Sequence, residues 1–452
     1  MLGRFSFIMR RLADSLNLNA RYVVLMARIM LTGFVVSSAR SLRGILPFLL
    51  ILLFLAPSAV LLAAEPEWPW MFVGGNFQIT RQPGDDFSPS VAADGDLYLV
   101  VWYRSTDSGF DIYGARVTSH GHVVDPQGFP ICTATGDQMF PVVAWDGESF
   151  FVVWQDRRSG KRWDLYGARV TRDGEVLNRD GSPLVIGKSN YDQIAPALAF
   201  DGETFGLAWH GKRNSRTWNV YFATVSRDGT VLSEKPIPLS PSTKNQASAA
   251  IAFGGENYLV VWQDLRGGKF YDIYGTRVTP SGKVLDPKGV AISPIAEDQI
   301  SGWDKWRPVL SWNGNLFLVV WMASRDDERW YVEGKRVDKT GQVLDLLDIS
   351  VESDTTKKTF PALMWDDGQF ILVWEDEPEG NSRIFGASIG PEYKPFIISD
   401  AVQISSPGGD DSSFPVVGGV GNGALVIWQG VGADGYWQIF GQRIWKVQGG
   451  WL

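Results

Sequence analysis

Aspartates recur at one place along the chain, and they are the carboxylates best placed to form a shared site. Each stands four residues before a proline. The series comprises Asp85, Asp137, Asp192, Asp304 and Asp411. If a repeat brings them to one opening, they form an acidic collar that would bind a cation, an amine or a sugar. The alternative is that each side chain caps its own turn by hydrogen bonds to the backbone.

Two features limit this collar as a metal site. Asn245 takes the aligned position in the fourth repeat, and Lys357 interrupts the series in the sixth. Calcium needs about six or more oxygen ligands, and the chain has no Asp-x-Asp-x-Asp-Gly loop. One cysteine and three histidines leave no Cys-ligated or multi-His site. We therefore expect no cofactor, with calcium left open only through the collar.

Two loops depart from the repeat and carry side chains suited to ligand binding. The first contains Trp303, Asp304, Trp306 and Arg307. Aromatic rings beside charged groups are typical of a platform for carbohydrate or peptide. The second contains His210, at a position where three repeats have glutamine. The alternative for both loops is ordinary packing and solvated charge.

These positions belong to a unit that repeats seven times. An apolar run ending in tryptophan recurs every 52–59 residues. The seven tryptophans are Trp102, Trp154, Trp209, Trp262, Trp321, Trp374 and Trp428. Around each lie short runs rich in Val, Ile and Tyr, bounded by Asp-Gly or Asn-Gly, which indicates antiparallel strands joined by tight turns. Each unit accommodates four strands, and such units predict the blades of a β-propeller.

The positions at which the repeat begins and ends predict a closed ring. The last unit ends after its third strand, at residues 438–444, and an orphan strand-like segment at residues 76–79 precedes the first unit. That segment can supply the missing outer strand of the last blade and so protect the edges of the sheet. We therefore predict an all-β fold, a closed seven-bladed β-propeller of four-stranded antiparallel blades.

The repeat resembles a known group of propeller sequences. Its pattern reads P-x-V-A-x-D-G-x-x-Y-L-V-V-W-Q-D-x-R, followed by D-I-Y-G-x-R-V and G-x-V-L-D. This is similar to exported prokaryotic repeats described as WD40-like or TolB-like, over about 375 residues. The Gly-His and Trp-Asp dipeptides of true WD40 repeats are absent from the expected places. The resemblance implies the propeller fold, and it implies binding or scaffolding more often than catalysis.

Residues present in most repeats are expected to serve the blade itself. The tryptophans should fill the space between neighbouring sheets. An arginine of the third strand recurs as regularly, and we expect it to pair with repeated aspartates. These arginines are Arg116, Arg169, Arg277, Arg336 and Arg443, and the candidate partners are Asp125, Asp156, Asp264 and Asp286.

The N-terminal region differs from the rest in charge and hydropathy. Residues 1–64 carry +6 and residues 65–452 carry −14, for a net charge of −8. An uncharged run of 20 residues, 45–64, is long enough to cross a hydrocarbon core of about 30 Å. We expect 1–42 to be cytoplasmic or an overcalled start, and 43–64 to be a signal peptide or signal-anchor helix. The propeller would then be exported, either membrane-anchored or, after cleavage, secreted or periplasmic.

Two functions follow from these patterns, and a binding function is preferred. A glycosidase needs two carboxylates about 5–10 Å apart, and the inner strands hold no charged side chain beyond the collar. No P-loop, Gly-x-Ser-x-Gly or His-Glu-x-x-His motif is present. We therefore expect a non-enzymatic binding or scaffold module for a protein, peptide or glycan. The alternative is a glycoside hydrolase or lyase that uses collar carboxylates. The acidic propeller argues against nucleic acid.

Overall fold

The computed structural model divides the chain into two compact units, 1–67 and 68–452. The residues that the structure describes are 71–72, 75–184, 190–214, 216–293, 304–326, 329–345, 349–351, 356–366, 368–390, 401–406, 411–419 and 423–445. The helix expected over 43–64 lies outside them. Among the described residues, no helix is long and apolar enough to cross a membrane.

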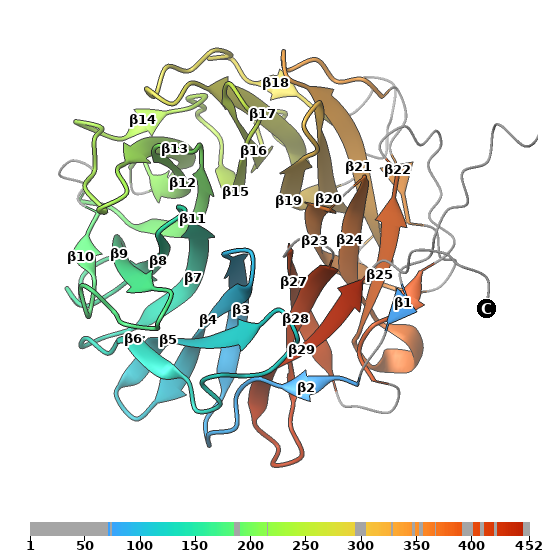
Figure 1. Ribbon diagram of the computed structural model, residues 1–452. Helices are drawn as coiled ribbons and strands as arrows, with labels where there is room; N and C mark the ends of the chain where they lie inside the picture. Colours follow the sequence, from blue (N-terminus) through green and yellow to red (C-terminus); the bar gives the residue numbers. More distant parts are fainter. Residues whose placement is uncertain are drawn as a thin grey trace, which may run out of the picture. The chain divides into compact units, whose positions relative to one another are not determined.

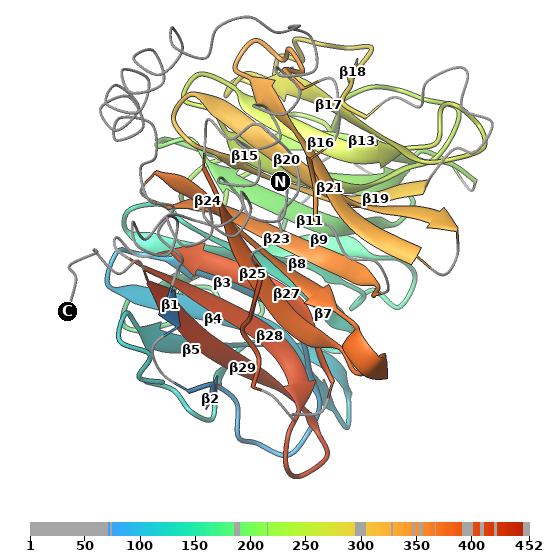
Figure 2. The same cartoon turned by 90° about the vertical axis from the view of Figure 1, so that its right-hand side faces the viewer.

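Seven antiparallel sheets surround a common axis, and the first strand of each blade is the innermost (Figure 1). Figure 2 shows the same ring of sheets from its side. The first three blades are β3 to β6 (Asp86–Ala93, Leu97–Thr106, Gly109–Thr118, Phe129–Cys132), β7 to β10 (Gln138–Trp145, Ser149–Asp156, Asp164–Thr171, Ser182–Pro183) and β11 to β14 (Gln193–Phe200, Phe205–Lys212, Trp218–Val225, Ile237–Pro238).

The remaining blades follow the same plan. The fourth to sixth are β15 to β18 (Gln246–Phe253, Tyr258–Asp264, Asp272–Val278, Val290–Ala291), β19 to β22 (Asp304–Trp312, Leu316–Asp326, Arg329–Asp338, Ile349–Ser350) and β23 to β26 (Lys358–Asp366, Gln369–Asp376, Arg383–Ile389, Val402–Gln403). The seventh contains β27 (Ser412–Gly419), β28 (Gly423–Val431) and β29 (Trp437–Trp445). A 3-10 helix, η1 (Pro378–Gly380), lies in the loop between β24 and β25. The predicted seven-bladed propeller is confirmed.

The turns between first and second strands follow from their Asp-Gly sequences. In the second blade, Oδ1 of Asp146 accepts hydrogen bonds from the backbone N–H groups of Glu148 and Ser149, at 2.8 and 2.7 Å. Gly147 between them has a φ of +93°, which residues with a side chain rarely adopt. The Asp-Gly pair therefore fixes both the direction and the register of this hairpin.

The N-terminal segment closes the ring, as predicted. β1 (Met71–Phe72) and β2 (Phe77–Gln78) both pair with β29, the third strand of the last blade (Figure 1). Beyond β2, the backbone N–H of Ile79 donates to the carbonyl of Ile439 at 2.8 Å. The last blade thus combines strands from both ends of the propeller.

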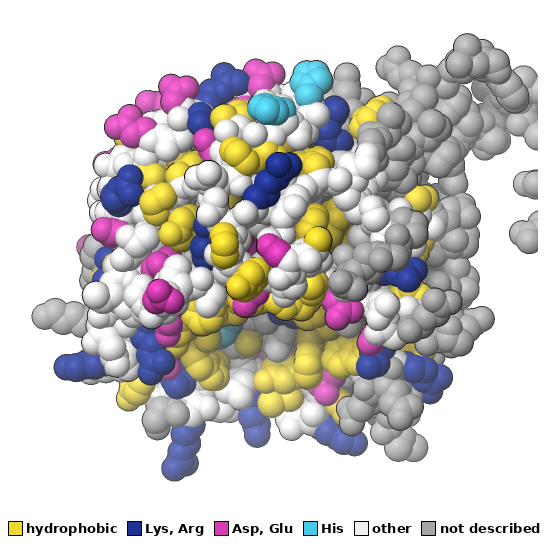
Figure 3. Space-filling view, turned by 90° about the horizontal axis from the view of Figure 1, so that it is seen from below, with side chains coloured by type: hydrophobic (Ala, Val, Ile, Leu, Met, Phe, Trp, Pro, Cys, Tyr) yellow, Lys and Arg dark blue, Asp and Glu magenta, His cyan; other side chains and the backbone are white. Residues whose placement is uncertain are grey.

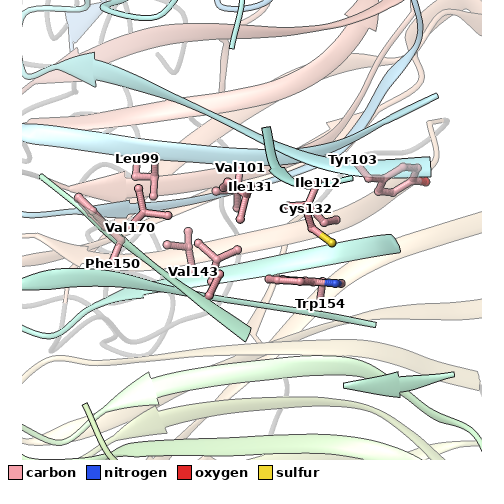
Figure 4. Packing of buried hydrophobic residues seen from close by; sticks show 12 residues of the cluster. Leu99, Val101, Tyr103, Ile112, Ile131, Cys132, Val143, Phe150, Trp154 and Val170 are labelled. Atoms are coloured by element: carbon pink, nitrogen blue, oxygen red, sulfur yellow. The ribbon is translucent and has the colours of Figure 1, made fainter. Parts of the chain in front are cut away.

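The repeated tryptophans form the core, as predicted, and each is at most 2% exposed. Figure 4 shows Trp154 of the second blade beside Ile112 and Cys132 of the first, so this ring joins two sheets. Its Nε1 donates to Oδ2 of Asp156 at 3.0 Å, which satisfies the one polar atom of the buried indole. Burying rings of this size contributes several kcal/mol per blade, on the order of 3–5.

Three of the five predicted third-strand arginines pair with aspartates, whereas Nε of Arg169 donates to Oγ of Ser149 at 3.0 Å. Arg116 pairs with Asp125 at 2.8 Å, and the fourth and fifth blades repeat this geometry. The repeated pairs are Arg277 with Asp286 and Arg336 with Asp345. Asp156 and Asp264 pair instead with arginines two residues further along their own chain segment, Arg158 and Arg266.

Candidate functional site

Each inner strand contains a β-bulge near its start, opposite the core tryptophan. In β3, Ser88 and Pro89 together face the single residue Trp102 of β4. The first residue of every bulge has a φ of 48–54°, which costs a residue with a side chain on the order of 1 kcal/mol. We call these residues the bulge row: Ser88, Phe140, Ala195, Ser248, Arg307, Phe360 and Phe414.

Three side chains of the bulge row stack on one another across three blades. The guanidinium of Arg307 lies over the ring of Phe360, 4.6 Å from its centroid, and over that of Phe414 at 5.4 Å. The two phenyl centroids are 4.1 Å apart. Because Arg307 of the fifth blade reaches Phe414 of the seventh, these side chains must lie close to the axis of the ring. We call this opening the mouth.

A second row of residues supports the bulges from the strand behind them. These residues directly follow the core tryptophans, and three of them are glutamines. Each glutamine Oε1 accepts the backbone N–H of the bulge residue in the next blade. The pairs are Gln155 with Ala195 at 3.1 Å, Gln263 with Arg307 at 3.2 Å and Gln429 with Ser88 at 2.9 Å. The amide therefore satisfies an N–H that the bulge removes from the sheet.

In the sixth blade, Glu375 replaces this glutamine. Burial raises the pKa of its carboxyl to about 7, although the hydroxyl of Ser382 and the backbone of Phe414 lower it. Ser382 donates to Oε1 at 3.0 Å, whereas Oε2 is buried without a hydrogen-bond partner. A carboxyl with this pKa is about half protonated at neutral pH, which is the property of a general acid.

Arg307 is a positively charged residue of the mouth whose charge interacts with this carboxyl. Desolvation lowers the pKa of Arg307, while Glu375 acts in the opposite direction. Its side chain is exposed to solvent, and it makes no ion pair with any described residue. The mouth thus combines a protonatable carboxyl, an unpaired guanidinium and two phenyl rings.

The predicted acidic collar lies next to the mouth, but its carboxylates are engaged with the backbone. Four of the five cap the third strand of the preceding blade rather than their own turn. Oδ1 of Asp85 accepts the N–H of Trp437 at 2.9 Å, Asp192 that of Trp163 at 3.1 Å, Asp304 that of Tyr271 at 2.9 Å and Asp411 that of Ser382 at 3.3 Å. Asn245 makes the same bond to Trp218. The side chain at this repeated position therefore joins neighbouring blades through a hydrogen bond, which we call a staple.

Asp137 and Trp303 complete the set of sequence-predicted residues around the collar. Asp137 occupies the same position as the other aspartates, and its carbonyl accepts the N–H of Arg157 at 2.8 Å. Trp303 lies outside the described residues. Of the carboxylates named from the sequence, Asp411 is the one whose charge acts on Glu375, where it raises the pKa.

Trp306 and His210 lie among half-buried aromatic rings. Trp306 packs edge-on against Trp330 and Tyr271, with centroids 5.3 and 6.4 Å apart. His210 meets the ring of Trp218 edge-on at 5.3 Å. Burial lowers the pKa of His210 to about 4, so its imidazole is neutral. Both side chains pack as the alternative interpretation required, yet Nε1 of Trp306 and Nδ1 of His210 have no hydrogen-bond partner.

Other parts of the described chain offer less chemistry. No group of three or more His, Cys, Asp or Glu among the described residues could hold a metal ion. A groove of about 570 Å³ lies between the third and fourth blades, beside the turn that contains Asp201. Hydrogen bonds from the backbone of Thr204 and Glu203 lower the pKa of Asp201 despite its partial burial. That carboxylate is ionised and occupied, so the groove lacks the proton donor found in the mouth.

Glu375 is the functional residue that the sequence prediction missed. Glu375 lies on the second strand of its blade, β24, whereas the carboxylates predicted from the sequence lie at the starts of the inner strands. A signal was present, since the glutamine of Val-Val-Trp-Gln-Asp in the second and fourth repeats is glutamate in the sixth. Its burial could not be read from that change.

Comparisons with known proteins identify no family for this chain. No family model and no curated protein matches it. A protein of unknown function from Dyadobacter fermentans is 12% identical, over 84% of this chain and 99% of its own, with a TM-score of 0.49. A thermostable family-43 glycoside hydrolase is 13% identical over 62% and 97%, with a TM-score of 0.38. The GH93 α-L-arabinofuranosidase of Fusarium graminearum is 11% identical over 84% and 98%, with a TM-score of 0.41.

These comparisons correct one expectation from the sequence. A non-enzymatic binding or scaffold module was preferred, yet the similar solved structures are mainly glycoside hydrolases, including arabinofuranosidases and an exo-1,5-α-L-arabinanase. The preference rested on the lack of an available carboxyl near the axis, and Glu375 removes that premise. At 10–13% identity the likeness itself concerns the fold.

Proposed function

We propose that this protein is a carbohydrate-active enzyme, a glycoside hydrolase whose active site is the mouth. The observation that carries the proposal is Glu375, a carboxyl with a pKa of about 7 at a position where three other blades have glutamine. The fold does not need a carboxyl there, since three blades have an amide and the fifth has Met322. A buried carboxyl at this position therefore has a chemical use rather than a structural one.

Glu375 would act as the proton donor. Its protonated Oε2, the oxygen without a partner, gives its proton to the glycosidic oxygen as the bond to the anomeric carbon breaks. The sugar ring would stack on the phenyl rings of Phe360 and Phe414, since apolar sugar faces pack well on aromatic surfaces. The guanidinium of Arg307 would donate hydrogen bonds to the substrate.

Asp411 is the candidate for the second carboxylate. It lies on the next blade, and its charge already acts on Glu375. As a base it would take a proton from the water that attacks the anomeric carbon. The two carboxyl groups together then hold as many protons after the reaction as before it, because Glu375 has given one to the leaving group. Its bond to the N–H of Ser382, at 3.3 Å, leaves the second oxygen for this task.

The test is hydrolysis of a panel of polysaccharides by the full chain, measured as release of reducing ends. We expect Glu375→Gln to abolish product release while leaving the unfolding transition intact, because glutamine is the residue of three other blades. Asp411→Asn should also lose activity, and the matched change Asp85→Asn, at the equivalent position of the first blade, should not. Unchanged hydrolysis by Glu375→Gln would exclude the proposed mechanism.

We also propose that the propeller is exported, as its resemblance to exported WD40-like repeats suggests. Support comes from the uncharged run 45–64, which follows Arg40 and Arg43 and precedes an acidic segment. A reporter enzyme active only outside the cytoplasm, fused after residue 452, should be active. Replacing Leu53 with Arg should abolish that activity, and an active Leu53→Arg fusion would refute the proposal.

A further inference from the structure

Arg307 is a cation without a counter-ion at the centre of the mouth. It is exposed to solvent and stacked on two phenyl rings, and no described carboxylate lies within ion-pair distance of it. The bulge that presents it is strained. A guanidinium stacked on aromatic rings keeps its donors free and oriented, which suits recognition of a planar carboxylate or of a sulfate.

Three loops on the same face of the ring as Arg307 carry a local excess of positive charge. The loops between second and third strands in three consecutive blades, residues 157–163, 213–217 and 265–271, contain eight Lys or Arg and no carboxylate. The whole chain has 50 acidic and 42 basic residues, so these loops are a local exception. The cations among them that are exposed and enter no ion pair with a described residue are Arg157, Lys161, Arg213, Arg216 and Lys269.

Aromatic rings stand among these cations. Trp163 directly precedes the third strand of its blade and Trp218 begins that of the next, and both are partly exposed. Arg157 lies over the ring of Trp163 at 5.8 Å, and Lys212 lies over that of Trp218 at 5.0 Å. Alternating rings and cations fit a chain of sugars that carries negative groups, because the rings take the apolar faces and the cations take the charges.

The charge is distributed unevenly between the two faces, although the collar aspartates lie on the same face as the mouth. Figure 3 shows acidic side chains and histidine gathered at the upper edge of that view, while Lys and Arg project along its lower edge around recessed hydrophobic side chains. Turns between first and second strands supply acids to one face, as with Asp94, Asp146 and Asp201. The loops listed above supply cations to the other.

We propose that the mouth recognises an acidic saccharide, one whose sugars carry carboxylate or sulfate groups. This inference rests on the proposed function and names its substrate class. Arg307 would bind the anionic group of the sugar nearest Glu375, and the cationic loops would bind those of neighbouring sugars. A bound anion there would also help to keep the proton on Glu375, since a nearby negative charge favours the neutral carboxyl.

The experiment is calorimetric titration of the full chain with three oligosaccharides of equal length: an oligogalacturonate, its carboxyl-reduced counterpart and a sulfated neutral oligosaccharide. We expect at least one anionic oligosaccharide to bind about 10-fold or more tightly than the reduced one, with affinity that falls as salt is raised. The tighter of the two anionic probes assigns carboxylate or sulfate. Equal affinity for the neutral oligosaccharide would overturn the inference.

Variants distinguish specific binding of the anionic group by Arg307 from non-specific electrostatic attraction. Arg307→Gln should weaken binding of the anionic oligosaccharide about 10- to 100-fold, and Arg307→Lys, which retains the charge, should weaken it less. Arg172→Gln is the matched control, because Arg172 pairs with Asp94 and Asp96 on the opposite face. An equal loss in Arg172→Gln would overturn the inference, as would equally tight binding of a single-stranded oligonucleotide of the same charge.

The two proposals fail in different ways. Glu375→Gln should bind the anionic oligosaccharide as well as the unmodified chain does. If that binding is found but no saccharide is cleaved, the catalytic proposal fails and the recognition stands. If neutral saccharides alone are bound and cleaved in a Glu375-dependent manner, the recognition fails and the catalysis stands.

Discussion

Gln429 and Glu375 occupy equivalent positions in adjacent blades, and they differ only in that Gln429 ends in an amide and Glu375 in a carboxyl. Gln429 accepts the N–H of a bulge residue in the next blade, as do Gln155 and Gln263. Glu375 stands beside the equivalent bulge at Phe414, but as a carboxyl whose pKa burial raises to about 7. The comparison shows that an amide acceptor is sufficient for the architecture at this position, and that a titratable carboxyl is not required.

The same distinction separates the core from the mouth as a whole. The core tryptophans are present in all seven blades and are nearly inaccessible, so their role is the same in each. The bulge row has one backbone conformation but four different residue types. Backbone geometry is repeated there, while the chemistry is confined to Arg307, Phe360 and Phe414 and their neighbour Glu375.

The largest effect is expected when the carboxyl is moved from one blade to the next. Glu375→Gln should lower kcat/KM on a cleaved saccharide by about 10²- to 10⁴-fold, the usual contribution of a general acid. Adding Gln429→Glu should not restore activity, because the relocated carboxyl would lie beside Ser88 rather than beside Phe414. Steady-state kinetics of the single and double variants tests this. Recovery in the double variant would show that position within the ring is irrelevant.

Removing a core tryptophan should have the largest effect on stability. Trp262 is fully buried, so Trp262→Ala should lower the free energy of unfolding by about 3–5 kcal/mol. Phe140 of the bulge row is 41% exposed, and Phe140→Ala should cost well under half as much. Urea unfolding of both variants gives the comparison. Equal losses would mean that the mouth is part of the structural core.

The pH dependence of stability should distinguish the carboxyl from the amide. The pKa of Glu375 is raised from 4.5 to about 7 on folding, so the folded state binds its proton more tightly. Its contribution to stability is therefore full below pH 4.5 and is lost as the pH rises through 7. Glu375→Gln should be more stable than the unmodified chain at pH 8, by up to about 3 kcal/mol, and should lose that advantage at pH 4.

The measurement for this prediction is urea unfolding at pH 4 and pH 8. Gln429→Glu provides the matched control, because a carboxyl introduced into the equivalent site should acquire the same loss of stability at high pH. An advantage of Glu375→Gln that is identical at both pH values would show that Glu375 titrates normally.

The smallest effect is expected at the staples between blades. Asp304→Ala removes the acceptor for the N–H of Tyr271 and should cost about 1 kcal/mol, as loss of a cap does. Asp304→Asn should cost only a few tenths, since Asn245 makes the same bond in the neighbouring blade. Thermal unfolding of the two variants measures the difference. A large loss in Asp304→Asn would mean that the charge itself is needed.

Most of the fold was predictable because its signals are local and repeated. The spacing of the tryptophans, the Asp-Gly turns and the orphan segment at 76–79 depend on a few adjacent residues each, and the strand pairing follows from them. The bulges were not predicted. Their sequence mark is the residue before the proline, such as Ser88, and nothing about that residue alone indicates a positive φ.

The site was predictable only in part. Arg307 was selected because it breaks the repeat, and the structure places it at the mouth. Asp192 and Asp304 were selected because they recur, but recurrence proved to report a bond to the neighbouring blade. Residues of both the sixth and the seventh blade surround Glu375 and raise the pKa of its carboxyl. Such contacts between blades cannot be read from the sequence of a single repeat.

The closure of the ring also imposes an order of events on folding. The hydrogen bond from Ile79 to Ile439 joins residues 360 positions apart, and without the N-terminal strands the edge of β29 that they cover would be open. During synthesis the N-terminal strand must therefore wait, unpaired, until all seven blades have been made. The ring locks in a single late step, and any chain shortened before β29 remains an open row of blades with two edges available for aggregation.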